Sequence, residues 1–151
     1  MKYDALLDEA NAEGISIKER PFKTYDGRIK GKDIYLRKDM NTTEKACVLA
    51  EELGYYYTSV GNIIDMDSSS NRKQERQARL WAYNKQIGLK GLIRAYEHGC
   101  TASHEIAEYL DVTEEALQEC IEFYRDKYGE YKTVEHYIIF FIPHLAVLKK
   151  I

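Results

Sequence analysis

The sequence predicts an α+β fold, in which a small β-sheet and long helices are followed by a helical region and a C-terminal strand. Three observations support this fold class: short β-prone segments near the N-terminus, helix-periodic apolar residues through the middle of the chain, and an apolar run at 137–142. The 151 residues are enough to bury a core and fit one domain, or a domain with a small appendage. With 44% hydrophobic and 31% charged residues, the composition is typical of a soluble globular protein.

The first third of the chain predicts a helix and two short strands. A helix-spaced apolar set opens the chain and is closed by Gly14; its members are Tyr3, Leu6, Leu7 and Ala10. Residues 15–17 alternate like a strand that ends at Pro21, residues 25–28 carry a turn signal, and residues 34–36 predict a second strand.

A long helix with a clear start follows. Asn41 is placed as its N-cap, and Glu44 can complete a capping box three residues later. One apolar face runs along this helix through Ala46, Leu49, Ala50, Leu53 and Tyr57. The segment 62–71 is interpreted as a polar loop, after which a second long helix resumes near Lys73 and continues towards Gly88.

The second half of the chain predicts three shorter helices in a helix-turn-helix-like pattern. The first ends at Gly99, and Thr113 caps the third. The apolar residues of the first two helices are Leu92, Ile93, Tyr96, Ile106, Ala107 and Leu110. A β-prone strand at 137–142 is broken by Pro143.

The predicted organisation is a region 1–88 and a region 89–151, which we expect to pack as one compact unit. Three well-separated cysteines, Cys47, Cys100 and Cys120, fit neither a disulfide framework nor a metal site. No signal peptide and no membrane-length apolar run is found in the sequence, so the predicted location is the cytoplasm and no membrane partner is expected.

The residues with chemical potential lie at 51–55, on the first long helix. In a helical H-E-x-x-H motif the two histidines share one helix face and bind zinc, and the adjacent glutamate activates the metal-bound water. In this sequence the same spacing holds Glu51 and Tyr55 on one face, with Glu52 in the place of the base. Downstream, residues 75–82 form an E-x-x-A-x-x-aromatic-A pattern, which on a second helix would present Glu75 as a third, carboxylate ligand and bury Ala78, Trp81 and Ala82 against the first helix.

These segments together resemble the ImmA/IrrE family of metallo-endopeptidases, in the compact form found in prophages and integrative elements. The resemblance covers nearly the whole chain in the family's order and is carried by residues 43–45, 49–54, 75–82 and 105–113. It implies a gluzincin-like fold with a zinc ion, followed by a helix-turn-helix-like region. It also implies a partner, a helix-turn-helix repressor that such proteins cleave or otherwise inactivate.

Position by position, the resemblance puts Glu51 and Tyr55 at the two histidine ligand sites, Glu75 at the third ligand site and Glu52 at the general-base site. Replacing two imidazoles with a carboxylate and a phenol is expected to weaken or abolish zinc binding. By composition alone, the three glutamates are better interpreted as helix-surface acids, and it is their position in the family pattern that makes them candidate pocket residues.

Three functions therefore stay open: a peptidase that inactivates a repressor, a non-proteolytic antirepressor, and a DNA-binding regulator. The stretch 18–38 is basic, which indicates a solvated surface or a partner-binding face. The predicted recognition helix carries carboxylates that would face phosphate, namely Glu114, Glu115, Glu119 and Glu122, so we do not expect the protein to bind nucleic acid directly.

Overall fold

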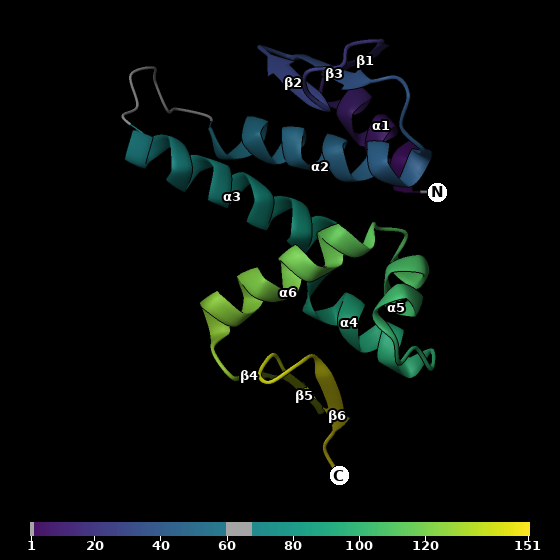
Figure 1. The fold of residues 1–151 in the computed structure, drawn as a ribbon, viewed down its shortest axis with the longest axis vertical. Helices are drawn as coiled ribbons and strands as arrows, with labels where there is room; N and C mark the ends of the chain where they lie inside the picture. Colours follow the sequence, from purple (N-terminus) through teal and green to yellow (C-terminus); the bar gives the residue numbers. More distant parts are fainter. Residues whose placement is uncertain (1, 60–67) are drawn as a thin grey trace. The chain divides into compact units, whose positions relative to one another are not determined.

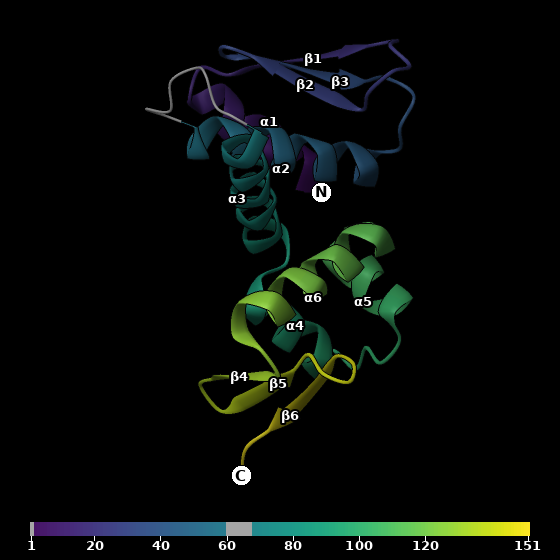
Figure 2. The same cartoon turned by 60° about the vertical axis from the view of Figure 1, so that its left-hand side comes forward.

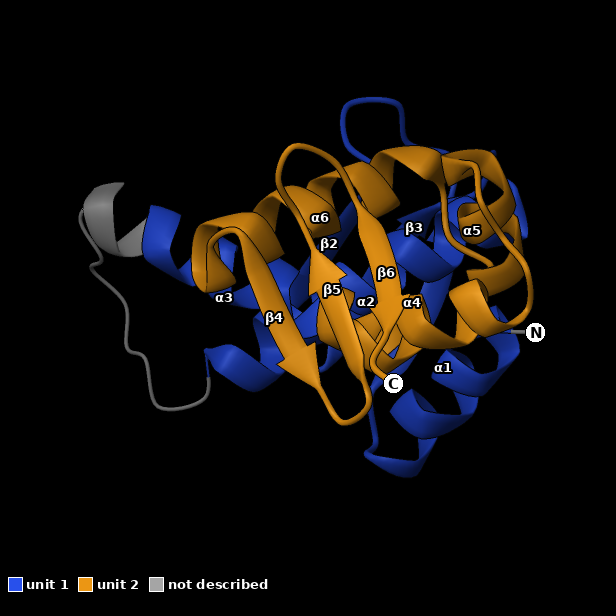
Figure 3. Cartoon of the chain, turned by 90° about the horizontal axis from the view of Figure 1, so that it is seen from below, with its two compact units in different colours: residues 1–82 blue, residues 83–151 orange. Residues whose placement is uncertain are grey.

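The computed structural model describes residues 2–59 and 68–151, without the side chains of 68–71. Its tertiary contacts divide the chain into two compact units, residues 1–82 and residues 83–151 (Figure 3). Each unit contains helices and one three-stranded sheet, which confirms the predicted α+β class.

In the first unit a three-stranded sheet lies on the first two helices of the chain, and a third helix packs against the second (Figures 1 and 2). Its elements are α1 (Lys2–Ala12), β1 (Ser16–Arg20), β2 (Gly27–Lys30), β3 (Asp33–Arg37), α2 (Thr42–Thr58) and the greater part of α3 (Ser68–Gln86). The strand order is β1-β3-β2, with β1 parallel and β2 antiparallel to the central β3. The two predicted strands correspond to β1 and β3.

The strand β2 was not predicted, and the second long helix begins earlier than predicted. Gly27 and Arg28, interpreted as part of a turn, are the first residues of β2, a strand with a single apolar side chain, Ile29. Residues 68–71, interpreted as loop, belong to α3. A strand this short and polar carries too few apolar residues for its period to be recognised. The rest of the predicted loop, 62–67, lies outside the described residues.

The core of the first unit lies between the sheet and the two helices below it. It contains Tyr3, Leu6, Ala10, Ile15, Ile34, Leu36, Met40, Ala46, Leu49, Ala50, Leu53 and Ala82. At its edge the Tyr3 hydroxyl donates to Glu19 Oε2 at 2.7 Å, and Lys45 Nζ donates to Glu19 Oε1 at 2.9 Å. The Lys45 hydrogen bond, followed by that of Tyr3, lowers the pKa of Glu19. One carboxylate therefore links α1, β1 and α2.

The predicted start of α2 is confirmed in detail. The Asn41 side chain accepts from the backbone N–H of Glu44 at 2.8 Å, and the Glu44 carboxylate accepts from the backbone N–H of Asn41 at 3.1 Å. This capping box satisfies donors that the first helical turn leaves unpaired. It therefore fixes the residue at which α2 begins, and with it the phase of the motif at 51–55.

The second unit packs three helices and a C-terminal sheet around its own core. Its elements are α4 (Gly88–Glu97), α5 (Ser103–Leu110), α6 (Glu114–Tyr128), β4 (Tyr131–Val134), β5 (Tyr137–Phe140) and β6 (Ala146–Lys149). Thr113 caps α6 as predicted, accepting from the Ala116 backbone N–H at 3.0 Å. On α6, Glu114 and Glu115 are exposed, whereas Glu119 accepts a hydrogen bond from Tyr83.

The prediction of one C-terminal strand was incomplete, because the segment at 137–142 pairs on both sides. β5 is the central strand of an antiparallel sheet in the order β4-β5-β6. The β4–β5 connection is only two residues long, and Glu135 there has a φ of 54°. Asn or Gly normally takes that backbone conformation in a tight hairpin, so the sequence carries no hairpin signal.

Cys47, Cys100 and Cys120 are free thiols. Among the helices described, none combines the length and the apolar character needed to cross a membrane.

Candidate functional site

The site is built where α2 and α3 approach each other closely. A Cβ atom on Gly54 would lie far inside van der Waals contact with the backbone carbonyl oxygen of Ala78, so only glycine fits at this position of α2. Next to this contact the rings of Tyr57 and Trp81 lie 5.3 Å apart between centroids. Ala78 and Ala82 are buried, as the 75–82 pattern predicted, whereas Trp81 is only half-buried.

The close approach brings the four predicted site residues into one cavity of about 320 Å³. Glu51 and Tyr55 share a face of α2, with Glu52 beside them, and Glu75 lies opposite on α3. Glu51 and Glu52 are half-buried, Tyr55 is 39% exposed and Glu75 is exposed. The structure thus places the four residues together, while their chemical roles stay a prediction.

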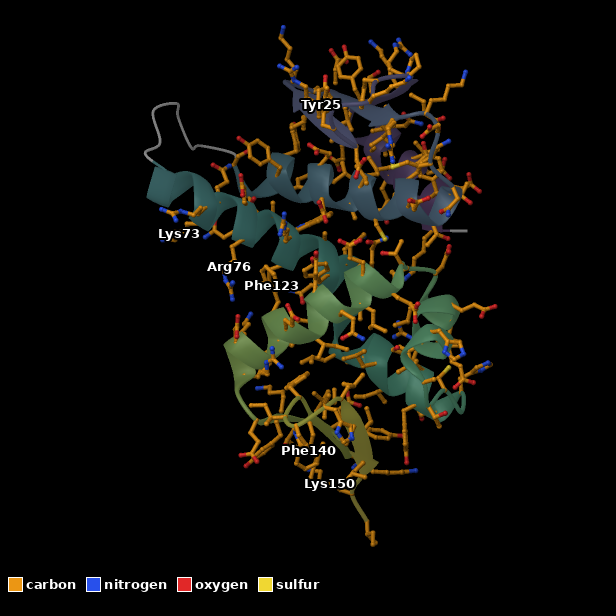
Figure 4. All side chains as sticks on the ribbon, viewed as in Figure 1. Tyr25, Lys73, Arg76, Phe123, Phe140 and Lys150 are labelled. Carbon is orange, nitrogen blue, oxygen red and sulfur yellow. The ribbon has the colours of Figure 1, made fainter. Side chains whose placement is uncertain are left out.

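Two further lining residues were not identified from the sequence. Ile29 enters from β2, the strand that the sequence did not indicate. Arg79 lies four residues after Glu75 on α3, so the helical period could have placed it on the same face. Its guanidinium adds one positive charge to a cavity lined by three carboxylates. Lys73 and Arg76 project from α3 away from α2 (Figure 4), so they lie outside this cavity.

Glu52 lies in an environment that opposes its ionisation. A Cβ atom on Gly27 of β2 would lie 3.2 Å from Glu52 Oε1 and 2.5 Å from Val48 Cγ1, so the strand backbone covers this carboxyl closely. Burial first, and the neighbouring charge of Glu51 second, raise the pKa of Glu52 to about 7. At neutral pH this carboxyl is therefore divided between its protonated and ionised forms, which suits a group that donates and accepts protons.

The residues present do not fit a zinc site. Zinc in proteins is bound by cysteine, histidine and carboxylate side chains, and catalytic sites hold it with at least one histidine in the familiar ligand sets. The residues that the resemblance assigns to the three ligand positions are Glu51, Tyr55 and Glu75, and none of them is a histidine or a cysteine. Throughout the described residues, no group of three or more His, Cys, Asp and Glu side chains is arranged to hold a metal ion.

In the first unit, α2 and α3 form an acidic cavity beside β2, an edge strand of the small sheet. A family model described as Peptidase_M78, IrrE N-terminal-like domain, matches residues 10–122. Since the match covers more than half of the sequence, the chain belongs to this family, which confirms the predicted resemblance. No curated protein and no solved structure matches the chain significantly.

Proposed function

We propose that this protein inactivates a helix-turn-helix repressor of a prophage or integrative element by binding it, without hydrolysing it. The observation that carries the proposal is a well-formed cavity whose lining residues do not make a zinc-binding set. The Gly54–Ala78 approach and the cavity beside it are present in a chain of a metallopeptidase family, yet none of the residues that we propose at the ligand positions supplies an imidazole. Because the expected partner binds DNA inside the cell, we propose a cytoplasmic location.

Binding without hydrolysis is consistent with the physical chemistry of the cavity. Its lining combines carboxylates, a phenol and a guanidinium, which can hydrogen-bond a peptide segment in an extended or helical form. Such contacts require no metal. Zinc would be needed only to activate water and to polarise a carbonyl group, and this donor set is a poor one for that ion.

The test is to mix the purified 151-residue chain at low salt with a helix-turn-helix repressor whose gene neighbours its own. Size-exclusion chromatography reports association, and intact mass spectrometry of the same sample reports cleavage. We expect a complex that contains intact repressor. Failure of the two folded proteins to associate at low salt would remove the proposal.

A second candidate, peptide hydrolysis, is favoured by one observation, the pKa of about 7 at Glu52. That value suits a general base at neutral pH. The two candidates are separated by Glu52→Gln, with the exposed Glu122→Gln on α6 as the matched control. Repressor fragments that form with the wild type and the control, but not with Glu52→Gln, would establish hydrolysis in place of binding alone.

A further inference from the structure

The outer face of the first sheet carries a second cavity, of about 250 Å³, with a different chemical character. Three cationic and three aromatic side chains line it, and no carboxylate does; they are Arg20, Arg28, Lys30, Phe22, Tyr25 and Tyr35. None of these residues lines the cavity between α2 and α3. The two cavities are therefore separate sites within one unit.

Strand register explains why these side chains point outward together. On β2, Arg28 and Lys30 are exposed while Ile29 between them faces the core. On β3, Tyr35 lies between two buried residues and is the cross-strand partner of both Lys18 on β1 and Arg28 on β2. Because side chains alternate along a strand, burying the apolar residues forces the cations and the tyrosine onto the opposite face.

The acids of this face do not neutralise the cations that line the cavity. Arg37 pairs with Asp26 at 3.3 Å and with Asp39 at 3.6 Å, and Lys18 pairs with Asp33 at 3.9 Å. Within the described residues, none of the three lining cations has a carboxylate partner. Their charge is thus available to a ligand.

The aromatic rings are grouped and partly exposed. The rings of Phe22 and Tyr25 are 4.4 Å apart between centroids, and Tyr25 is 39% exposed. The guanidinium carbon of Arg28 lies 5.8 Å from the centroid of the Tyr25 ring, and Arg28 Nη1 donates to the Tyr25 hydroxyl at 3.5 Å. Figure 4 shows Tyr25 on the sheet side of the unit, among other projecting side chains.

We propose that this cavity binds single-stranded nucleic acid, with one base stacked at Tyr25 and the adjoining phosphates held by Arg28 and Lys30. Sites for unpaired strands combine aromatic rings, which stack on any base, with cations that follow the backbone. An acidic peptide would use the cations but would leave the rings without a partner. The sequence-based expectation against nucleic-acid binding rests on the carboxylates of α6, whereas the residues that line this cavity include no carboxylate.

The test measures fluorescence anisotropy of a labelled oligonucleotide of about 12 thymidines with the full-length chain at low salt. Tyr25→Ala is expected to weaken binding about 5- to 100-fold, the usual effect of losing one stacking ring. Arg28→Gln is expected to reduce the slope of log affinity against log salt by about 0.7, the effect of one lost phosphate contact. Lys32→Gln is the matched control: Lys32 belongs to the same basic stretch but does not line the cavity, so this slope should stay unchanged.

Competitors identify the ligand. An abasic oligonucleotide of equal length should bind more weakly than the thymidine strand, and a polyglutamate peptide should not displace the strand. Equal binding of the abasic strand, displacement by polyglutamate, or displacement by free thymidine monophosphate at equal concentration would each overturn the proposal. Failure of the wild type to bind the thymidine strand at low salt would overturn it as well. Should Tyr25→Ala not fold, Tyr25→Leu removes the ring while keeping apolar volume and must show the same loss.

Discussion

Replacing Glu52 with glutamine is expected to stabilise the protein at alkaline pH and to leave it unchanged at acidic pH. Glutamine has nearly the shape of a protonated glutamate and carries no charge at any pH. The wild-type carboxyl, in contrast, ionises beneath β2 and beside Glu51, where burial and like charge oppose ionisation. The difference in the free energy of unfolding between the wild type and Glu52→Gln therefore measures the free energy cost of ionising residue 52 in the folded state.

The sign and size of the effect follow from linkage. The pKa of Glu52 is about 7 in the fold against its usual 4.5, so the folded state holds the proton more tightly than the unfolded state. The contribution of Glu52 to the free energy of unfolding consequently falls as the pH rises from about 4.5 through about 7, and this contribution changes little beyond that range. At about 1.4 kcal/mol per pKa unit, the full effect is about 3 kcal/mol. Because the side chain is only half-buried, we expect about 1–3 kcal/mol at pH 8, or about 2–12 °C in Tm.

Urea unfolding of the wild type and of Glu52→Gln gives the difference between their free energies of unfolding, measured once at about pH 5 and once at about pH 8. Glu75→Gln is the matched control, because Glu75 lines the same cavity with an exposed side chain; we expect it to change stability by less than about 0.5 kcal/mol at both values. NMR of the side-chain carboxyl carbon follows the titration itself. A midpoint near 4.5 for residue 52, or an equal stability difference at both pH values, would refute the reasoning.

The remaining predictions concern packing, metal and charge. Gly54→Ala is expected to cost about 1–3 kcal/mol in urea unfolding, because the new methyl group meets the backbone of the facing helix; an unchanged midpoint would contradict this close approach. The purified wild type should contain less than one zinc per chain by elemental analysis. Glu51→His with Tyr55→His should gain zinc through Glu75 and, at a zinc concentration 100-fold above Kd, about 2.7 kcal/mol of stability; a folded variant without zinc would show that the helices do not present these ligands together. Glu19→Gln should destabilise the fold by about 1 kcal/mol at neutral pH, and since the folded pKa of Glu19 is lowered, this loss should shrink as the pH falls below about 4.5.

The parts of the fold that the sequence predicted well are those determined by local chemistry. The capping box of Asn41 and Glu44 requires only residues within one turn, and it is formed as expected. The phase of α2 follows from that start, so placing Glu51, Glu52 and Tyr55 near one another needed no knowledge of tertiary structure. Placing Glu75 in the same cavity required the family pattern, because two helices must meet for it to do so.

The parts that were missed depend on partners distant in the sequence. β2 is a strand only because β3 pairs with it, and its polar residues give no periodic signal. The environment of Glu52 could not be predicted either, since it arises where Gly27 of that strand covers the carboxyl. The cationic cavity on the sheet has the same origin: the sequence showed a basic stretch, but the rings of Phe22 and Tyr25 join it only through the chain reversal that precedes β2.

The packing of α2 against α3 also explains how the scaffold can exist with altered ligands. The contact that determines the helix approach is between Gly54 and the backbone of Ala78, and neither residue is a candidate ligand. Tyr57 and Trp81 strengthen the same contact through their rings. Since none of these interactions depends on a metal, the packing of α2 against α3 does not require residues 51 and 55 to be zinc ligands. Fold and hydrolytic chemistry are therefore physically separable in this chain, and a binding function can use the cavity that the fold maintains.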